Sequence, residues 1–179
     1  LLGRRILVVH RQLDLLAGLD AQLGRLEAVV LDDKRHFHVC SLRGAAGQGE
    51  AGGEDGNAII ALNLASTARV HLRGTPCRVL ISEVKLRIEA ADSFFYPDMM
   101  VTCSATDAAN RLIKREPVLV VEVLSPSTAA YDRGEKFAAY RTLPTLTEYV
   151  LIDPKSRRCD VYRKNDLGLW VLHPCEPGQ

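Results

Sequence analysis

The chain of 179 residues is long enough to bury the core of one ordinary domain. Its 47% hydrophobic and 25% charged residues exclude a disordered chain, and no apolar run approaches the roughly 20 residues that span a bilayer. A net charge of +1 gives no global sign of a nucleic-acid-binding surface, so any contact with DNA would depend on local charge.

The cysteines and the opening residues bear on the cellular compartment. The opening segment lacks the long apolar core and the small-residue cleavage site of a signal peptide, so we expect a cytoplasmic protein. The five cysteines are odd in number and form no CxxC pair, which predicts reduced thiols rather than a disulfide framework or a zinc knuckle. They are Cys40, Cys77, Cys103, Cys159 and Cys175.

Residues 1–56 form a divergent N-terminal segment that ends in a glycine-rich stretch, residues 43–57, with six of the thirteen glycines. We interpret this stretch as a linker within a single globular unit whose main part is residues 57–179. Leucines at helix-like spacing predict a helix within residues 11–30, and "FHVCSL" is typical of a short strand.

His36, His38 and Cys40 would share one face of that short strand. A zinc-dependent regulator is one hypothesis for them, but a half-buried strand is the simpler interpretation, and no fourth ligand can be assigned.

Beyond the linker, residues 58–72 are predicted to form an amphipathic helix that ends at Gly74 and Pro76. Short apolar or alternating segments then predict strands, and residues 128–143 between them predict a second helix that stops before Pro144. This order indicates an α/β fold in which helices flank a mixed sheet. The strand segments are residues 77–89, 97–103, 118–124, 148–153, 159–164 and 169–173.

Two carboxylates stand out in these strands. Glu122 lies inside the apolar run "VLVVEVL", and Asp98 precedes the apolar "MMV". A buried carboxylate is costly unless it is paired, hydrogen-bonded or bound to a metal. If residues 97–103 pair antiparallel with residues 117–123 around a loop centred near Asn110, Asp98 and Glu122 face each other, with Cβ atoms roughly 4.5 to 5.5 Å apart.

Two such carboxylates repel each other, so a divalent cation between them is the natural compensation. Oxygen ligands with room for water and phosphate favour Mg²⁺ or Mn²⁺ over zinc, and such a cation promotes phosphodiester hydrolysis. The alternative is that the carboxylates are structural and are satisfied by backbone N–H groups or by Arg133 or Arg141.

Lys136 is the lysine that would complete this site. In the predicted helix Asp132, Lys136 and Tyr140 follow one another at spacings of four, so they share one helical face near the end of the Glu122 strand. The alternative for Asp132 and Lys136 is an exposed ion pair worth a few tenths of a kcal/mol.

The motifs around these residues carry a family resemblance. The stretch "FFYPDMMVTC", followed by "REPVLVVEVLSPSTAAYDRGEKFAAYRTLPTLTEYVLID", resembles the Uma-type restriction endonuclease family of the PD-(D/E)XK nuclease superfamily. The resemblance runs from near Asn57 to about Lys164. It implies a restriction-endonuclease-like core and a Mg²⁺ or Mn²⁺ site formed by Asp98, Glu122 and the backbone carbonyl of Val123.

The same resemblance implies an endonuclease acting on DNA, with Lys136 orienting or activating the attacking water. The usual lysine two residues after the acidic residue is Leu124 here, so Lys136 is similar to a lysine that has migrated to the following helix. An additional acidic ligand of the family is missing at the N-terminus, where Glu50 or Glu54 could substitute.

These departures keep a second hypothesis open, a catalytically silent nuclease fold that binds nucleic acid or protein. Nuclease folds of this kind often act as dimers, so a homodimer is a further expectation, and no membrane partner is expected.

Overall fold

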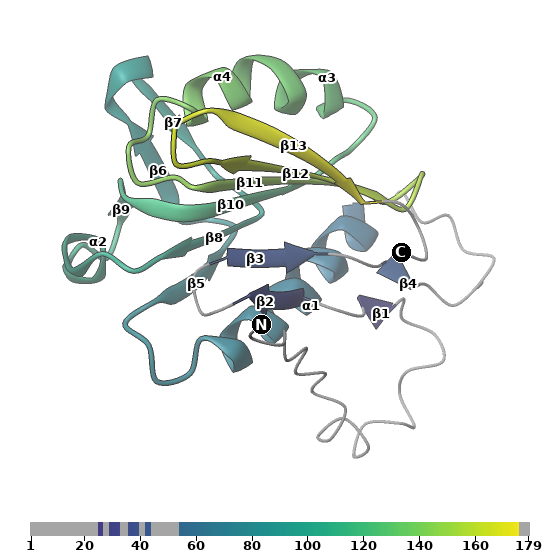
Figure 1. The fold of residues 1–179 in the computed structure, drawn as a ribbon, viewed down its shortest axis with the longest axis horizontal. Coiled ribbons are helices and arrows are strands. Elements are labelled where there is room, and N and C mark those ends of the chain that lie inside the picture. Colours follow the sequence, from purple (N-terminus) through teal and green to yellow (C-terminus); the bar gives the residue numbers. More distant parts are fainter. Residues whose placement is uncertain (1–24, 27–28, 33–35, 40–41, 44–53, 176–179) are drawn as a thin grey trace, which may run out of the picture.

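A computed structural model of the chain describes residues 25–26, 29–32, 36–39, 42–43 and 54–175 (Figure 1). Its centre is a six-stranded sheet in the order β13-β12-β11-β10-β8-β5, in which β10 and β11 are parallel and the other neighbours antiparallel. The predicted mixed sheet is therefore confirmed. Its strands are β5 (Arg78–Ile81), β8 (Met99–Thr102), β10 (Pro117–Val123), β11 (Glu148–Asp153), β12 (Arg158–Lys164) and β13 (Trp170–Cys175).

Helices cover both faces of this sheet (Figure 1). Helix α1 (Glu54–His71) packs on one face. The other face carries a continuous helical segment made of α3 (Ala129–Tyr131), the π-helical turn η2 (Asp132–Lys136) and α4 (Phe137–Tyr140). None of the helices in the described part of the chain is long and apolar enough to cross a membrane.

Side chains of the central strand β10 point alternately to the two faces of the sheet, so the strand contributes to the core on both faces. Val121 and Val123 are buried in the α1 layer, and Val120 and Leu124 are buried in the layer under the second helical segment. Glu122 belongs by this alternation to the second layer, where a wholly apolar side chain would otherwise be expected.

Smaller elements surround the main sheet. A three-stranded sheet in the order β7-β6-β9 lies beside it, and two short strand pairs, β1-β4 and β2-β3, lie N-terminal to α1. Their bounds are β1 (Arg25–Leu26), β2 (Val29–Asp32), β3 (His36–Val39), β4 (Leu42–Arg43), β6 (Lys85–Ile88), η1 (Glu89–Ala91), β7 (Ser93–Phe95), α2 (Ala105–Ala109) and β9 (Ile113–Lys114).

Several local predictions need correction. Residues 25–26 and 29–32 are strands, so the predicted helix over residues 11–30 is wrong there; its earlier part lies outside the described residues. Antiparallel pairing of β2 with β3 outweighs the helical spacing of the leucines. The predicted strand over residues 77–89 is broken into β5 and β6, and Glu83 lies between them with a φ of 56°.

The end of the predicted linker is also wrong, because α1 begins at Glu54 rather than at Ala58. Asp55 puts negative charge in the first turn of the helix, where the helix dipole favours it. The predicted C-terminal end is close to the observed one, and Gly74 adopts the left-handed conformation with a φ of 79°.

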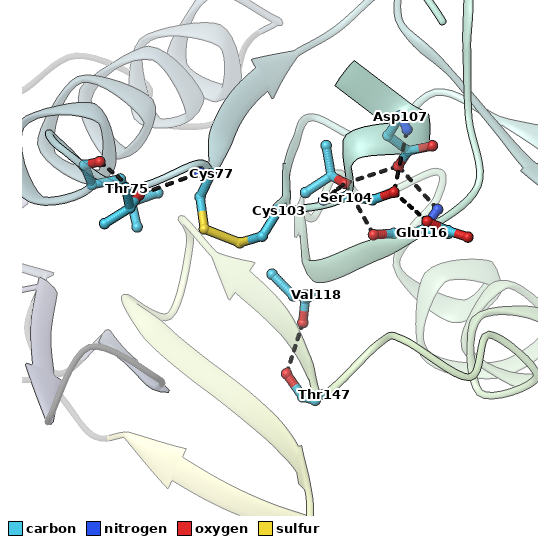
Figure 2. The surroundings of a disulfide bond; sticks show 10 residues. Thr75, Cys77, Cys103, Ser104, Asp107, Glu116, Val118 and Thr147 are labelled. Atoms are coloured by element: carbon cyan, nitrogen blue, oxygen red, sulfur yellow. Dashed lines mark hydrogen bonds between the residues drawn. A yellow bond between two sulfur atoms is a disulfide. The ribbon is translucent and has the colours of Figure 1, made fainter. Parts of the chain in front are cut away.

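A disulfide joins Cys77 to Cys103, so the prediction of reduced thiols is wrong for these two residues (Figure 2). The register of β5 on β8 pairs Arg78 with Thr102, which places the two cysteines directly opposite each other one step further out. Linear spacing cannot reveal this pairing, because 26 residues separate the two cysteines.

Candidate metal centre and its lysine

The structure brings Asp98 and Glu122 together at one end of the neighbouring strands β8 and β10. In the β8–β10 ladder Val121 faces Met99, so the predicted register is confirmed there, and Asp98 and Glu122 are the next residues along. Glu122 is only 3% exposed, and Asp98 is half-buried. One carboxylate is therefore enclosed in the protein, and the other reaches the rim of the site.

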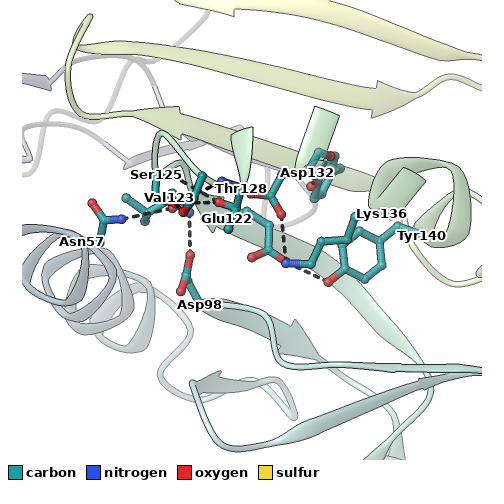
Figure 3. Close-up of polar contacts among 11 residues, drawn as sticks. Asn57, Asp98, Glu122, Val123, Ser125, Thr128, Asp132, Lys136 and Tyr140 are labelled. Atoms are coloured by element: carbon teal, nitrogen blue, oxygen red, sulfur yellow. Dashed lines mark hydrogen bonds and ion pairs between the residues drawn. The ribbon is translucent and has the colours of Figure 1, made fainter. Parts of the chain in front are cut away.

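Lys136 enters the site from the helical segment above the sheet (Figure 3). Its Nζ lies 2.9 Å from Glu122 Oε1 and 3.1 Å from Asp132 Oδ1. The hydroxyl of Tyr140 donates to the same Glu122 Oε1 at 2.7 Å. Lys136 therefore meets Glu122, and one helical face supplies Asp132, Lys136 and Tyr140 to this cluster.

Asp98 is held from the strand opposite it. Its Oδ2 accepts a hydrogen bond of 2.7 Å from the backbone N–H of Val123. The carbonyl of Val123 faces α1, where Asn57 Nδ2 lies 3.5 Å away. Both backbone groups of Val123 thus point into the space between β8, β10 and the start of α1 (Figure 3).

Burial dominates the ionisation of the two acids. It raises the pKa of Glu122 to about 7, even though the Lys136 ammonium opposes the change. Burial also raises the pKa of Asp98, against the hydrogen bond from the Val123 N–H. Burial alone would lower the pKa of Lys136, but the carboxylates of Glu122 and Asp132 outweigh it and the pKa is raised. Lys136 is therefore a cation throughout the neutral pH range.

The donor atoms present fit a hard divalent cation. Asp98 Oδ1 and Glu122 Oε2 make no hydrogen bond with the described residues, because each acid is fixed through its other oxygen. Glu122 and Asp132 both pair with Lys136, so two carboxylates face one ammonium, an excess of negative charge that a divalent cation would neutralise. No group of three or more His, Cys, Asp or Glu side chains that could hold an ion occurs within the described residues, so the protein would supply few ligands. Mg²⁺ is commonly bound in this way, with water and substrate phosphates completing its shell.

The structural alternatives for these residues can now be judged. Neither arginine pairs with the acids: Arg133 pairs with Asp160, and Arg141 stacks on Phe137. The backbone N–H alternative holds for one oxygen of Asp98. The expectation of an exposed Asp132–Lys136 pair is wrong, because the two side chains are only 4% and 13% exposed.

The side chains of the other predicted metal ligands are not described by the structure. His36 and His38 are in β3, but their side chains are not described, and Cys40 lies outside the described residues. Glu50 also lies outside them, and Glu54 is the first residue of α1.

Two contacts were not foreseen from the sequence. Asn57 lies beside the Val123 carbonyl, and the hydroxyl of Tyr149 donates to the backbone carbonyl of Asp132 at 3.0 Å. The apolar run around Tyr149 signals a buried strand, but it carries no information about the partner of the hydroxyl. Asn57 is the last residue of the predicted glycine-rich linker, and a linker gives no reason to place it near β10.

The comparisons agree with this fold. A family model named Uma2 and described as "Putative restriction endonuclease" matches residues 26–179. The chain belongs to this family of nuclease-type proteins. It is 40% identical over 121 residues to "Uncharacterized protein slr1290" of Synechocystis sp., which covers 68% of this chain and 64% of that protein. It is 34% identical over 116 residues to "Uncharacterized protein sll1609" of the same organism, covering 63% and 65%.

The matched region thus spans just under two thirds of each relative's own length. Among solved structures, the chain resembles a "putative nuclease belonging to DUF820" from Anabaena variabilis, with a TM-score of 0.55 and 16% identity over 78% of this chain and 72% of the other. That likeness shows the fold, and the predicted restriction-endonuclease-like core agrees with it.

Proposed function

We propose that this protein is a metal-dependent endonuclease that hydrolyses phosphodiester bonds of DNA. Asp98, Glu122 and the carbonyl of Val123 would hold a Mg²⁺ or Mn²⁺ ion, and Lys136 would assist the attacking water. The observation that carries the proposal is that a charged, buried lysine contacts Glu122 beside Asp98 on the neighbouring strand, while each of these two acids keeps one oxygen uncommitted to the described residues.

When bound, such an ion lowers the pKa of a coordinated water and neutralises charge on the phosphate. The protein's own groups set the geometry around it. Lys136 and Tyr140 fix Glu122 through Oε1, and Val123 fixes Asp98 through Oδ2. Because Lys136 is kept protonated, it acts as a donor and a positive charge toward the reacting phosphate or water, and not as the general base.

DNA as the substrate rests on the family description, which refers to restriction endonucleases. The net charge of the chain is only +1, so binding would depend on phosphate contacts close to the site. A homodimer and a cytoplasmic location remain predictions of the same proposal.

The experiment is a cleavage assay with purified protein on plasmid and single-stranded DNA, with Mn²⁺, Mg²⁺ or a chelator. Cleavage is expected only with metal, and it is expected to disappear in Asp98→Ala, Glu122→Ala and Lys136→Met. Asp160→Asn is the matched control, because it removes a carboxylate from the exposed Arg133 ion pair. Cleavage that persists unchanged in both acid variants would rule out this site.

One observation favours the second candidate, a catalytically silent nuclease fold that binds nucleic acid or protein. Leu124, buried among apolar side chains, stands where the superfamily usually has its lysine. Calorimetric titration with Mn²⁺ separates the candidates, because a silent domain without the site has no cation affinity that depends on Asp98.

A further inference from the structure

Asp132 is a buried carboxylate next to the proposed metal centre that the proposed reaction leaves without a role. Its side chain is 4% exposed, and its Oδ1 lies 3.1 Å from Lys136 Nζ. A buried carboxylate without a partner is costly, so the ion pair with Lys136 is what allows Asp132 to be buried as an anion. Arg133, the next residue, turns outward to pair with Asp160 instead.

The backbone around Asp132 is fixed by its own contacts. Its N–H donates to the Thr128 carbonyl at 2.9 Å, and its carbonyl accepts from the Tyr149 hydroxyl at 3.0 Å. The helix changes to a π-helical turn over Asp132–Lys136 before it returns to α-helix. Such turns are rare and recur at functional sites, where they place side chains that a regular helix would direct elsewhere.

The two acids orient the lysine between them. A lysine ammonium has three N–H donors on a flexible four-carbon chain, so one acceptor alone leaves its direction poorly defined. Here Glu122 accepts from one side and Asp132 from the other. Within the described part of the chain these are its two acceptors, which leaves one donor available to a ligand.

We propose that Asp132 is a positioning residue, which clamps the Lys136 ammonium against Glu122 and directs its remaining N–H toward the reacting group. The inference rests on the proposed function for what Lys136 does, but the clamp itself is a property of the metal-free protein. Asp132 acts through Lys136 and touches neither the proposed ion nor the substrate.

The first test needs no activity. In metal-free protein labelled with ¹⁵N, the ¹H–¹⁵N correlation of the Lys136 ammonium is identified by its loss in Lys136→Met. It is expected to be sharp in wild type and in Asp132→Glu, weaker in Asp132→Asn and lost to water exchange in Asp132→Ala. If Asp132→Ala does not fold, Asp132→Asn decides. A signal as intense as in wild type in every folded Asp132 variant overturns the proposal.

The second test measures Mn²⁺-dependent cleavage of the same variants. Asp132→Ala is expected to lower kcat by about 10- to 100-fold with little change in KM, as supporting residues around metal sites do. Asp132→Glu should restore part of the rate, and the control Asp160→Asn should match wild type. A raised KM with unchanged kcat contradicts positioning.

The two proposals fail in different ways. If wild type cleaves no DNA with either metal, the proposed function fails, and the ammonium spectrum still decides whether Asp132 clamps Lys136. If wild type cleaves DNA and Asp132→Ala cleaves equally fast, the function stands and the positioning role is wrong.

Discussion

Strand β8 has a buried acid cluster near each end, and the two clusters differ in how their oxygens are used. Beyond Thr102, Asp107 accepts from the backbone N–H of Arg115 through Oδ1, and from both the Thr102 hydroxyl and the backbone N–H of Glu116 through Oδ2. At the other end, Asp98 and Glu122 each use one oxygen and keep the other uncommitted to described residues.

The difference separates structural acids from candidate functional ones. A carboxylate whose two oxygens both accept hydrogen bonds from nearby residues holds its loop in place and has little capacity left for a ligand. A carboxylate held through one oxygen, beside a buried lysine, is fixed in place and keeps the capacity to bind. Burial alone therefore does not identify the site, because Asp107 is 2% exposed and Glu122 is 3% exposed.

The largest effect that this comparison predicts is a loss of stability when Asp107 is replaced. Asp107→Ala leaves two backbone N–H groups without an acceptor, while the Thr102 hydroxyl keeps the Glu116 carbonyl, and the change is expected to lower the free energy of unfolding by about 4 kcal/mol. Urea unfolding measures this loss, and the cleavage rate per folded molecule should not change. Asp107→Asn, which keeps one acceptor oxygen, should lose less. A stable Asp107→Ala protein with reduced cleavage would contradict the assignment of Asp107 as a structural acid.

The next largest effect is expected from loss of the Cys77–Cys103 disulfide, which lies near the Thr102 end of β8. It closes a loop with a sequence separation of 26 residues, so its loss in Cys77→Ser is expected to lower the free energy of unfolding by about 3 kcal/mol. A reducing agent should lower the melting temperature of wild type and leave that of Cys77→Ser/Cys103→Ser unchanged. Equal melting temperatures of oxidised and reduced wild type would show that the bond does not stabilise the fold.

Glu122, at the other end of the β8–β10 pair, should make the stability of the protein depend on pH. The pKa of Glu122 is about 7 in the folded chain and 4.5 without burial, so the folded state holds a proton that the unfolded state releases between these values. The stabilisation is complete below the lower value and is lost as the pH rises through the higher one. Metal-free wild type should therefore lose about 2 kcal/mol more than Glu122→Gln between about pH 5 and about pH 8. Parallel stability curves for the two proteins would exclude the raised pKa.

The smallest effect distinguishes two buried tyrosines. Tyr140→Phe removes a hydrogen bond to Glu122, and Tyr149→Phe removes one to the Asp132 carbonyl, so each is expected to cost about 1 kcal/mol of stability. Only Tyr140→Phe frees Glu122 Oε1 from a donor, and it should change Mn²⁺ affinity more than Tyr149→Phe does. Calorimetry on both variants checks this, and equal affinities would remove Tyr140 from the site.

Much of the fold could be predicted where periodicity and burial agree. The strand over residues 148–153 has the predicted bounds, and the second helical segment begins one residue after its predicted start. Asp98 and Glu122 could be found because a carboxylate in an apolar strand requires an explanation, and Lys136 because helical spacing of four places it on a known face.

The rest depended on contacts between residues distant in sequence. The Cys77–Cys103 pairing follows from strand register, and the partner of Tyr149 follows from the packing of the helix on the sheet. The burial of the Asp132–Lys136 pair could not be predicted, because helical spacing indicates the pair but not how deeply it lies. The strands at residues 25–26 and 29–32 were missed because their pairing with later residues outweighs local spacing.

The central claim is that Asp98 and Glu122 hold a divalent cation. Crystals grown with Mn²⁺ and measured for anomalous scattering test it most directly. We predict an anomalous peak bound by Asp98 and Glu122, within reach of the Val123 carbonyl, in wild type, and its loss in Asp98→Ala. No peak at saturating Mn²⁺, or a peak that persists in Asp98→Ala, would contradict it.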